Sequence, residues 1–471
     1  MIEVVKKGLT LLVVVNLLGG IVAAQKKNER PQVKVPNEFR GATVPTGQTS
    51  IGDLKWFEIF KDDELQKTVR TAMMQNYDLR LAVARINAAR ANLGLARSDQ
   101  FPQFAAGADL TTSRTSSNGP TGVFGQSGKS RSFGSVVVSL LTFELDVWGR
   151  LRQQTKAARA ELRASEEDRK AVQTIVVGDV AAAYFSLLEL DSELNIARQT
   201  LTTRQESLRL ITFRQQGGLA TALDVRQAQE LVYQASQTIP DTERQIVQTE
   251  NQLSFILGNN PGSITRGQPL DQQQTLPAVA AGLPSSLLER RPDIRAAEEN
   301  LIAQRALVSV AKRAFFPTIS LTGVFGFQSD QLSNLFSGPS KAWTFVPEIT
   351  QPIFTGGRLK SGVRFAKAQQ EFAIVQYQQT IQNAFKEVSD GLVQYQKVRE
   401  IRAQQELLVA TLRERSRLAH LRYEGGVDTL LNALDSDREL FDAELNLTQT
   451  KRNELLSLVQ LYKALGGGWQ Q

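Results

Sequence analysis

The sequence predicts a mainly helical protein with a membrane β-barrel portion, built from two copies of one unit. Three observations lead to this fold class. The second half of the 471-residue chain repeats the first half, and each half contains two strand-like segments. Each half then runs for about 65 residues without a proline, long enough for a helix of about 100 Å. Helices of that length are far longer than those of ordinary globular domains.

The N-terminal residues resemble an export signal. Two lysines precede an apolar run from Leu9 to Leu18, and small residues precede Gln25. The apolar run is too short to span a bilayer as a helix. We therefore predict a signal peptide over 1–24, with a short membrane anchor as the alternative. An N-terminal extended segment is predicted over 25–55.

The duplication can be followed motif by motif. Asn76–Pro102 matches Arg291–Pro317 at an offset of 215, whereas Gly149-Arg150-Leu151 matches Gly357-Arg358-Leu359 at an offset of 208. The first strand hairpin is therefore seven residues longer than the second. The extra residues fall in a Gly/Ser-rich loop, Ser113–Ser132, where added length costs little closure entropy.

These matches define the predicted domains. The first structural repeat covers 56–262 and includes a strand hairpin at about 103–147. The second repeat covers 290–471 and includes a hairpin at about 317–354. A linker over 263–289 joins the two repeats. Each repeat reads as a helix, two strands, a very long helix, a tight turn and a final helix.

The strand segments alternate between apolar and polar residues. The predicted apolar faces contain Phe104, Ala106, Ala108 and Leu110; Val137, Leu141, Phe143, Leu145 and Val147; Ile319, Leu321, Phe325 and Phe327; and Phe345, Ile349 and Ile353. Strands of about ten residues with one apolar and one polar face are typical of transmembrane β-barrels. A soluble sheet packed on helices is the alternative.

Four strands per chain cannot close a membrane barrel, because the smallest such barrels have eight strands. Open strand edges are not tolerated in lipid, so several copies of the chain must combine. A strand that turns directly into a very long helix then has a simple explanation. A short barrel in the membrane continues into a long helical tube outside it.

Composition argues against catalysis. The chain has no cysteine and one histidine, His420, which we expect to be a surface residue. Thiol chemistry and Cys-based metal sites are excluded, and no phosphate-binding or dinucleotide-binding glycine motif occurs. The net charge of +7 is spread over alternating charges, so no patch for nucleic acid is expected. We predict no enzymatic activity, no cofactor and no metal.

Three segments resemble the TolC-type outer membrane factors of tripartite efflux pumps and type I secretion. They are "GLPSSLLERRPDIRAAEENLIA" (Gly282–Ala303), "AKRAFFPTISLTG" (Ala311–Gly323) and "IPDTERQIVQTENQLSFILGNNPG" (Ile239–Gly262). They are most similar to the branch that serves resistance-nodulation-division efflux pumps. The resemblance implies a homotrimer in outer membrane lipid, with a trimeric 12-stranded β-barrel that continues into a 12-helix periplasmic α-barrel.

The same resemblance implies a function. The trimer would be the exit duct of a tripartite efflux pump, passively conducting small molecules from the periplasm to the exterior of a Gram-negative cell. Its partners would be a periplasmic adaptor and an inner-membrane pump. A type I secretion duct is the alternative on the same fold, and a periplasmic structural coiled-coil protein is the alternative of another class. Many members carry a lipid-anchor cysteine, which this sequence lacks, so no lipid anchor is expected.

Two double-glycine turns, "QQGGLATALD" and "YEGGVDTLLNALDSD", are predicted at the periplasmic end of the tube. The resemblance places adaptor-docking tips and a gate there. The docking tips are Gly218, Leu219, Ala220, Gly426, Val427 and Asp428. The gate residues are Asp224, Tyr423, Asn432 and Asp435.

Asp224 and Tyr423 would hold neighbouring helices together, and Asn432 and Asp435 would ring the narrowest opening. Asn432 stands where some members have an acid. The residues also permit simpler interpretations. Asp224 fits a helix cap with Thr221, and Tyr423 fits packing at a helix end. Asp428, Asp435 and Asp437 fit a solvated face.

Overall fold

The computed structural model describes residues 31, 33–42, 50–114, 130–274 and 279–469. The predicted signal peptide and most of the predicted loop Ser113–Ser132 lie outside these residues. Residues 35–471 form one compact unit that contains both repeats.

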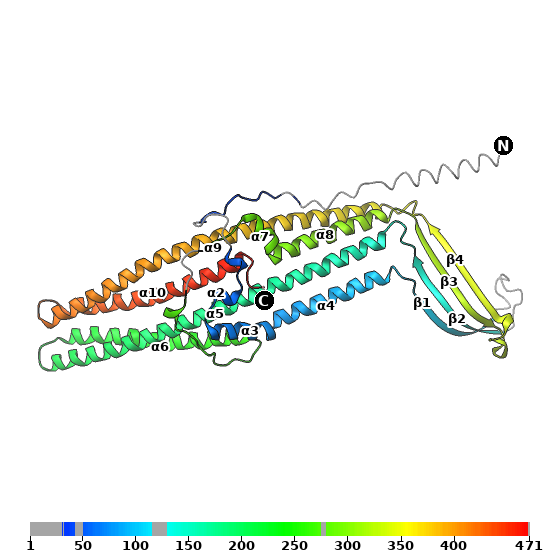
Figure 1. Ribbon diagram of the computed structural model, residues 1–471. Coiled ribbons are helices and arrows are strands. Elements are labelled where there is room, and N and C mark those ends of the chain that lie inside the picture. The colour runs from blue at the N-terminus through cyan, green and yellow to red at the C-terminus, as the bar shows by residue number, and fades with distance from the viewer. Residues whose placement is uncertain (1–30, 32, 43–49, 115–129, 275–278, 470–471) are drawn as a thin grey trace. The chain divides into compact units, whose positions relative to one another are not determined.

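The long helices occur as two sets of equal length (Figure 1). The 22-residue helices are α4 (Tyr77–Ser98) and α8 (Pro292–Arg313). The 67-residue helices are α5 (Arg150–Gln216) and α9 (Arg358–Glu424), which confirms the predicted helix length. The 35-residue helices are α6 (Ala222–Ile256) and α10 (Leu430–Ala464). The shorter helices are α2 (Trp56–Ile59), α3 (Asp63–Gln75) and α7 (Pro284–Arg290), with 3-10 turns at Ile51–Asp53, Leu270–Gln272, Leu332–Asn334 and Gly338–Ser340.

In each repeat a 22-residue helix and a 35-residue helix meet end to end. Asn76 caps the start of α4, and its side-chain amide donates to the carbonyl of Ile256 at the end of α6, at 2.8 Å. At the equivalent place in the second repeat, Arg291 donates to the carbonyl of Ala464, at 3.0 Å. These bonds satisfy helix-end carbonyls that would otherwise lack partners. Each pair therefore acts as one long element beside α5 or α9.

The four strands form one antiparallel sheet in the order β1-β2-β3-β4. They are β1 (Phe104–Arg114), β2 (Ser130–Glu144), β3 (Thr318–Ser329) and β4 (Lys341–Thr350). One face is apolar, where Ala106, Val138, Phe325 and Trp343 lie in one cross-strand row. The other face is polar, where the Ser135 hydroxyl donates to Asp109.

The prediction for the second strand was partly wrong. A register shift between Leu140 and Phe143 inserts a β-bulge. Val137 pairs with Gly107 and therefore lies on the polar face, whereas Phe143 pairs with Leu321 on the apolar face. A bulge adds one residue to one strand and so reverses the faces beyond it.

Helix α5 is the central element, since it packs against α3, α4, α6, α8 and α10. Among the described helices, it alone has a window long and apolar enough to cross a membrane, and most of that window is buried inside the fold. Its middle part holds Tyr184 and Leu187, both fully buried. We therefore regard α5 as a core helix.

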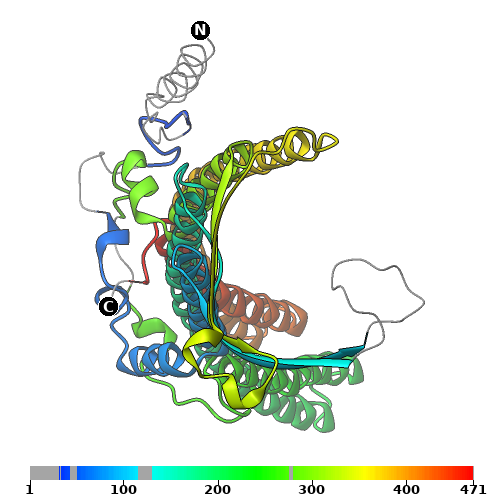
Figure 2. The same ribbon diagram turned by 90° about the vertical axis from the view of Figure 1, so that its right-hand side faces the viewer.

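Viewed from the strand end, the long helices and the sheet form a curved layer (Figure 2). Helix α3, helix α7 and the C-terminal residues lie on the convex side of this layer (Figure 2). Contacts attach the start of α3 to α5: the Tyr184 hydroxyl donates to Asp62, the N-cap residue of α3, at 3.2 Å, and the Phe185 ring lies 6.0 Å from that of Phe60. Tyr184 and Phe185 therefore lie on the side of α5 that faces the convex side of the layer.

Candidate functional site

The two hairpin turns have the same backbone geometry. Gly218 and Gly426 adopt left-handed φ angles of 76° and 69°. The amide of Leu219 donates to the carbonyl of Arg214, and the amide of Val427 donates to that of Arg422, at 2.8 and 3.0 Å. This pattern is a Schellman motif, which ends a helix and satisfies its last carbonyls. Both turns therefore need glycine at one position, as the sequence predicted.

Some of the predicted docking-tip residues are exposed, whereas others pack against or bond to their own chain. Leu219 and Val427 are 77% and 67% exposed, although both are apolar. Around Gly218 and Gly426 there is open space. Ala220 instead packs against the buried cluster of Ile211, Ala228, Leu231, Leu430 and Leu434.

Asp428, the remaining tip residue, is held within its own chain. Its carboxylate accepts from the amide of Thr429 at 2.8 Å, from Asn432 at 2.6 Å and from Arg422 at 3.1 Å. These bonds, that of the Thr429 amide first, lower the pKa of Asp428. The structure therefore brings together Asp428 of the predicted tips and Asn432 of the predicted gate.

Asp224 forms a capping box with Thr221. Its carboxylate accepts from the backbone amide and the hydroxyl of Thr221 at 2.7 and 2.8 Å, and the Asp224 amide donates to the same hydroxyl at 3.2 Å. Tyr423 packs against the buried cluster below the tips, with the guanidinium of Arg214 5.0 Å from its ring centre. Within the described part of one chain, Asp224 and Tyr423 are not bonded to each other. Their predicted role between helices stays a prediction.

Asp435 also has partners in its own chain. Its carboxylate forms ion pairs with Arg438 and, at 3.7 Å, with Arg415. Arg415, Asp428 and Asn432 line a groove of about 830 Å³ between α9 and α10. The four predicted gate residues are thus near the tips, but each has its own partners, and within the described part of one chain no hydrogen bond or ion pair joins any two of them.

A polar cluster a few turns above the tips was not predicted. His420 binds Asp437 at 2.8 Å, and the Ser416 hydroxyl donates to the same carboxylate at 2.6 Å. The hydrogen bond to Asp437 raises the pKa of His420, although burial opposes the shift. A Ser-His-Asp catalytic site needs its serine bonded to the histidine, and here the serine bonds to the aspartate instead. The only signal in the sequence was the spacing of four between Ser416 and His420, which places both on one helix face.

Arg204 is a second residue that was not predicted. Its side chain lies between the α5–α6 and α9–α10 helix pairs, and the residue is 4% exposed. It donates to the carbonyl of Leu231 at 2.8 Å and lies 4.8 Å from the ring centre of Phe441. Its Nε and Nη2 atoms have no partner among the described residues. Burial lowers its pKa, and the charges of Asp437 and Asp442 oppose that shift. Arg204 therefore ties α5 to α6 and α10.

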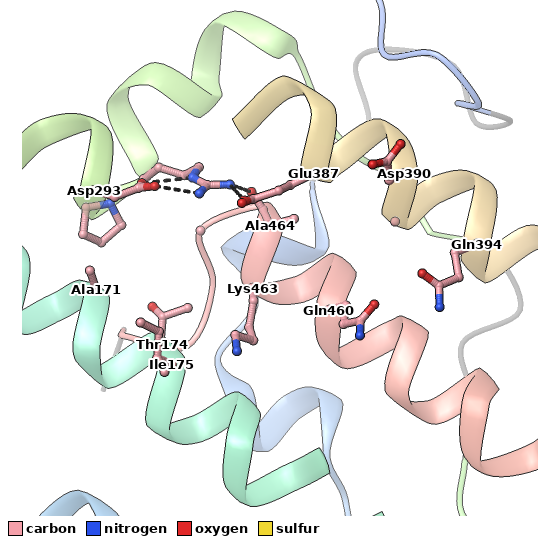
Figure 3. Close-up of a pocket in the computed structure, with 14 residues that line it drawn as sticks. Ala171, Thr174, Ile175, Asp293, Glu387, Asp390, Gln394, Gln460, Lys463 and Ala464 are labelled. Carbon is pink, nitrogen blue, oxygen red and sulfur yellow. Dashed lines mark hydrogen bonds and ion pairs between the residues drawn. The ribbon is translucent and has the colours of Figure 1, made fainter. Parts of the chain in front are cut away.

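A cavity of about 580 Å³ lies where α10 meets α8 (Figure 3). Arg291 lines it and binds both Asp293 and Glu387, each at 2.6 Å; Figure 3 labels these two carboxylates. Lys463, which also lines the cavity, binds Asp179 at 3.1 Å. The charged groups are paired with one another, so the cavity is a structural joint between helices. Among the residues that the structure describes, no group of three or more His, Asp or Glu side chains could hold a metal ion.

Comparison with known proteins agrees with this architecture. Residues 68–259 and 283–467 match the family described as "Outer membrane efflux protein". The chain is 37% identical to outer membrane protein OprJ of Pseudomonas aeruginosa, over 98% of this chain and 96% of that protein. It is also 37% identical to the toluene efflux pump outer membrane protein TtgF of Pseudomonas putida, over 93% and 90% of the two chains.

Solved structures show the same fold. A crystal structure of the open state of the Neisseria gonorrhoeae MtrE outer membrane channel superimposes with a TM-score of 0.85 and 31% identity, over 94% of this chain and 98% of that one. A membrane protein from Pseudomonas aeruginosa superimposes with a TM-score of 0.87 and 36% identity, over 94% and 100%. The predicted resemblance and fold class are confirmed. This chain belongs to the outer membrane efflux protein family and is an outer membrane channel of the TolC type.

Proposed function

We propose that three copies of this chain form the exit duct of a tripartite efflux pump, together with a periplasmic adaptor and an inner-membrane pump. The observation that carries the trimer is the open sheet. Strands β1 and β4 each have one unpaired edge, and the sheet has one apolar face. Unpaired backbone groups are not tolerated in lipid, so β4 of one copy must pair with β1 of the next. Three copies give the twelve strands of the predicted barrel.

The cargo is proposed to be small molecules, moved passively and without chemistry by this chain. Relatives at 37% identity are named for efflux, and two of them are named for toluene. A type I secretion duct remains the second candidate, because the same tube would serve a different inner-membrane partner. Leu219 and Val427, exposed and apolar at the tips, are the residues we assign to adaptor contact.

Strand pairing between copies can be tested by disulfide formation, because the natural chain has no cysteine. One cysteine replaces Ala108 on β1, and a second is moved along β4 from Lys341 to Val346. We expect oxidation to give covalent dimers and trimers at one register of the scan. The matched control is Val138→Cys with Phe325→Cys, which are partners within one sheet and should cross-link only inside the chain. A chain that stays monomeric and dissolves without detergent would instead support the structural coiled-coil alternative.

The gate is proposed to act between copies in the trimer. Asp224→Ala with Tyr423→Phe should raise single-channel conductance in planar bilayers while the trimer stays intact. Thr221→Ala is the control, because it removes the cap partner of Asp224 but keeps the carboxylate. If Thr221→Ala raises conductance as much as the double variant, Asp224 is a helix cap and the gate lies elsewhere.

Asp435 and Asn432 are proposed to line the narrowest opening. Asp435→Ala should weaken block by multivalent cations added from the periplasmic side, since carboxylates from three copies would attract such ions. Asn432→Ala, which removes no charge, should leave the block unchanged. Equal block in wild type and Asp435→Ala would remove Asp435 from the pore lining.

A further inference from the structure

A basic pocket lies where α4 and α5 approach the strands. It has a volume of about 410 Å³ and is lined by Arg97, Gln100, Phe101, Arg152, Thr155, Lys156 and Arg159. Four of these seven side chains are cationic and none is acidic. Concentrated positive charge in a concave site attracts an anion.

Three of the four cations are not neutralised. Arg152 forms an ion pair with Asp146 at 3.1 Å. Arg97, Lys156 and Arg159 are exposed, and among the described residues they have no ion pair. Asp99, an acidic residue two positions after Arg97, does not line the pocket. The pocket therefore keeps a net positive charge.

The pocket faces the convex side of the helical layer. Arg152, Lys156 and Arg159 follow at intervals of four and three residues, so they share one face of α5. Lys170 lies eleven residues beyond Arg159, about three helical turns, and so occupies the same face. The Lys170 ammonium lies 5.0 Å from the ring centre of Trp469, in the C-terminal residues on the convex side (Figure 2). The cations thus point away from the concave interior.

The internal duplication supplies an independent observation. At the offsets of 215 and 208, the four cations of the first repeat correspond to four cations of the second. The matched pairs are Arg97 with Lys312, Arg152 with Lys360, Lys156 with Arg364, and Arg159 with Lys367. All eight are exposed. In every pair one repeat has arginine and the other has lysine. The two repeats therefore share positive charge, rather than one residue type, at the same distance from the strands.

The pocket lies at the junction between helices and strands, which in a membrane barrel is the edge of the membrane. Helix α4 ends at Ser98 and β1 begins at Phe104. Between them, Phe101 lines the basic pocket, and Phe101 and Phe104 are each 67% exposed. Phe104 belongs to the apolar face of the sheet, which contacts lipid in a membrane barrel. An exposed apolar surface therefore continues directly from the cationic pocket.

We propose that this pocket binds the phosphate headgroup of an anionic phospholipid from the membrane leaflet on the helix side, with its acyl chains along Phe101 and Phe104. The headgroup phosphate supplies the negative charge that neutralises the unpaired cations. The acyl chains cover the exposed rings of Phe101 and Phe104. In basic clusters next to a membrane, each Lys or Arg increases the affinity for anionic lipid by about fivefold.

The test titrates the detergent-solubilised full chain with phosphatidylglycerol or phosphatidylcholine and counts bound lipid by native mass spectrometry. The wild type should bind phosphatidylglycerol more tightly than phosphatidylcholine. Lys156→Gln with Arg159→Gln should weaken phosphatidylglycerol binding by about 25-fold, from two cations at about fivefold each. The matched control is Arg209→Gln with Arg226→Gln, which removes the same charge from exposed positions near the tips and should leave binding unchanged.

A separate arm adds inorganic phosphate as a competitor, because a free anion shares the headgroup chemistry. Phosphatidylglycerol binding that persists in excess phosphate supports a lipid site. Displacement by inorganic phosphate would mean that the pocket takes a free anion, and the lipid assignment would be wrong. Equal binding of the two lipids, or equal loss in the test and control variants, would also overturn the proposal.

Discussion

Arg291 offers the sharpest test of how α8, α9 and α10 of the second repeat are joined. The change is Arg291→Met, which removes the charge but keeps most of the side-chain volume. In the wild type the Arg291 side chain is 9% exposed, and its guanidinium binds Asp293, Glu387 and the carbonyl of Ala464. The variant would leave two carboxylates without their partner and the end of α10 without its cap.

The size of the effect follows from burial. Removing one partner of a buried ion pair costs about 3–5 kcal/mol. Here Asp293 and Glu387 are 38% and 40% exposed and can recover water, so the loss should be smaller. We expect about 2 kcal/mol, which corresponds to a roughly 30-fold change in a local opening equilibrium.

Hydrogen–deuterium exchange measures this opening locally. Amides of Leu465 and Gly466, which cap α10, should lose protection by about 30-fold in Arg291→Met. Arg295→Met is the matched control, since the Arg295 and Glu289 side chains are 38% and 56% exposed, and such pairs contribute about 1 kcal/mol or less. If the two variants exchange alike at these amides, Arg291 does not hold the joint and the reasoning from burial fails.

Further predictions concern single side chains. The pKa of His420 is raised in the folded state. Its bond to Asp437 therefore stabilises the fold at pH values below the pKa of the unfolded imidazole, and this stabilisation is lost as the pH rises through the pKa of the folded state. Thermal unfolding of His420→Gln should show a smaller pH dependence than that of the wild type. Gly218→Ala should cost about 1–2 kcal/mol because its φ is 76°, whereas Gly217→Ala, at φ −80°, should be tolerated; melting temperatures compare them. Trp148→Phe keeps the stacked ring but loses a 2.7 Å bond to a carbonyl next to β3, and calorimetry should show a loss of about 1 kcal/mol.

Much of the fold could be predicted because the strongest signals are local or repeated. Proline-free runs bounded by glycine predicted α5 and α9, and the structure begins each one directly after Gly149 or Gly357. The bulge in β2 could not be predicted. Its position depends on pairing with β1 and β3, and the residues on both faces near Leu140 are apolar enough to fit either register.

The candidate site was predictable in position but not in contacts. The double glycines located both turns, and the Thr221 spacing indicated the cap that Asp224 forms. The bond of His420 to Asp437 and the burial of Arg204 depend on how α5, α9 and α10 pack, and nothing adjacent in the sequence indicates these partners. Contacts between copies lie beyond any single chain, which is why the gate residues remain to be tested.

The matching helix lengths of the two repeats limit how such a protein can change. Helices of 22, 67 and 35 residues occur in both copies, whereas the seven-residue difference between copies falls in one predicted loop. One residue inserted into α5 alone would move its tip by about 1.5 Å and rotate everything beyond it by about 100°. The reach from membrane to tip can therefore lengthen only when both copies gain the same insertion, in steps near a heptad, or about 10 Å.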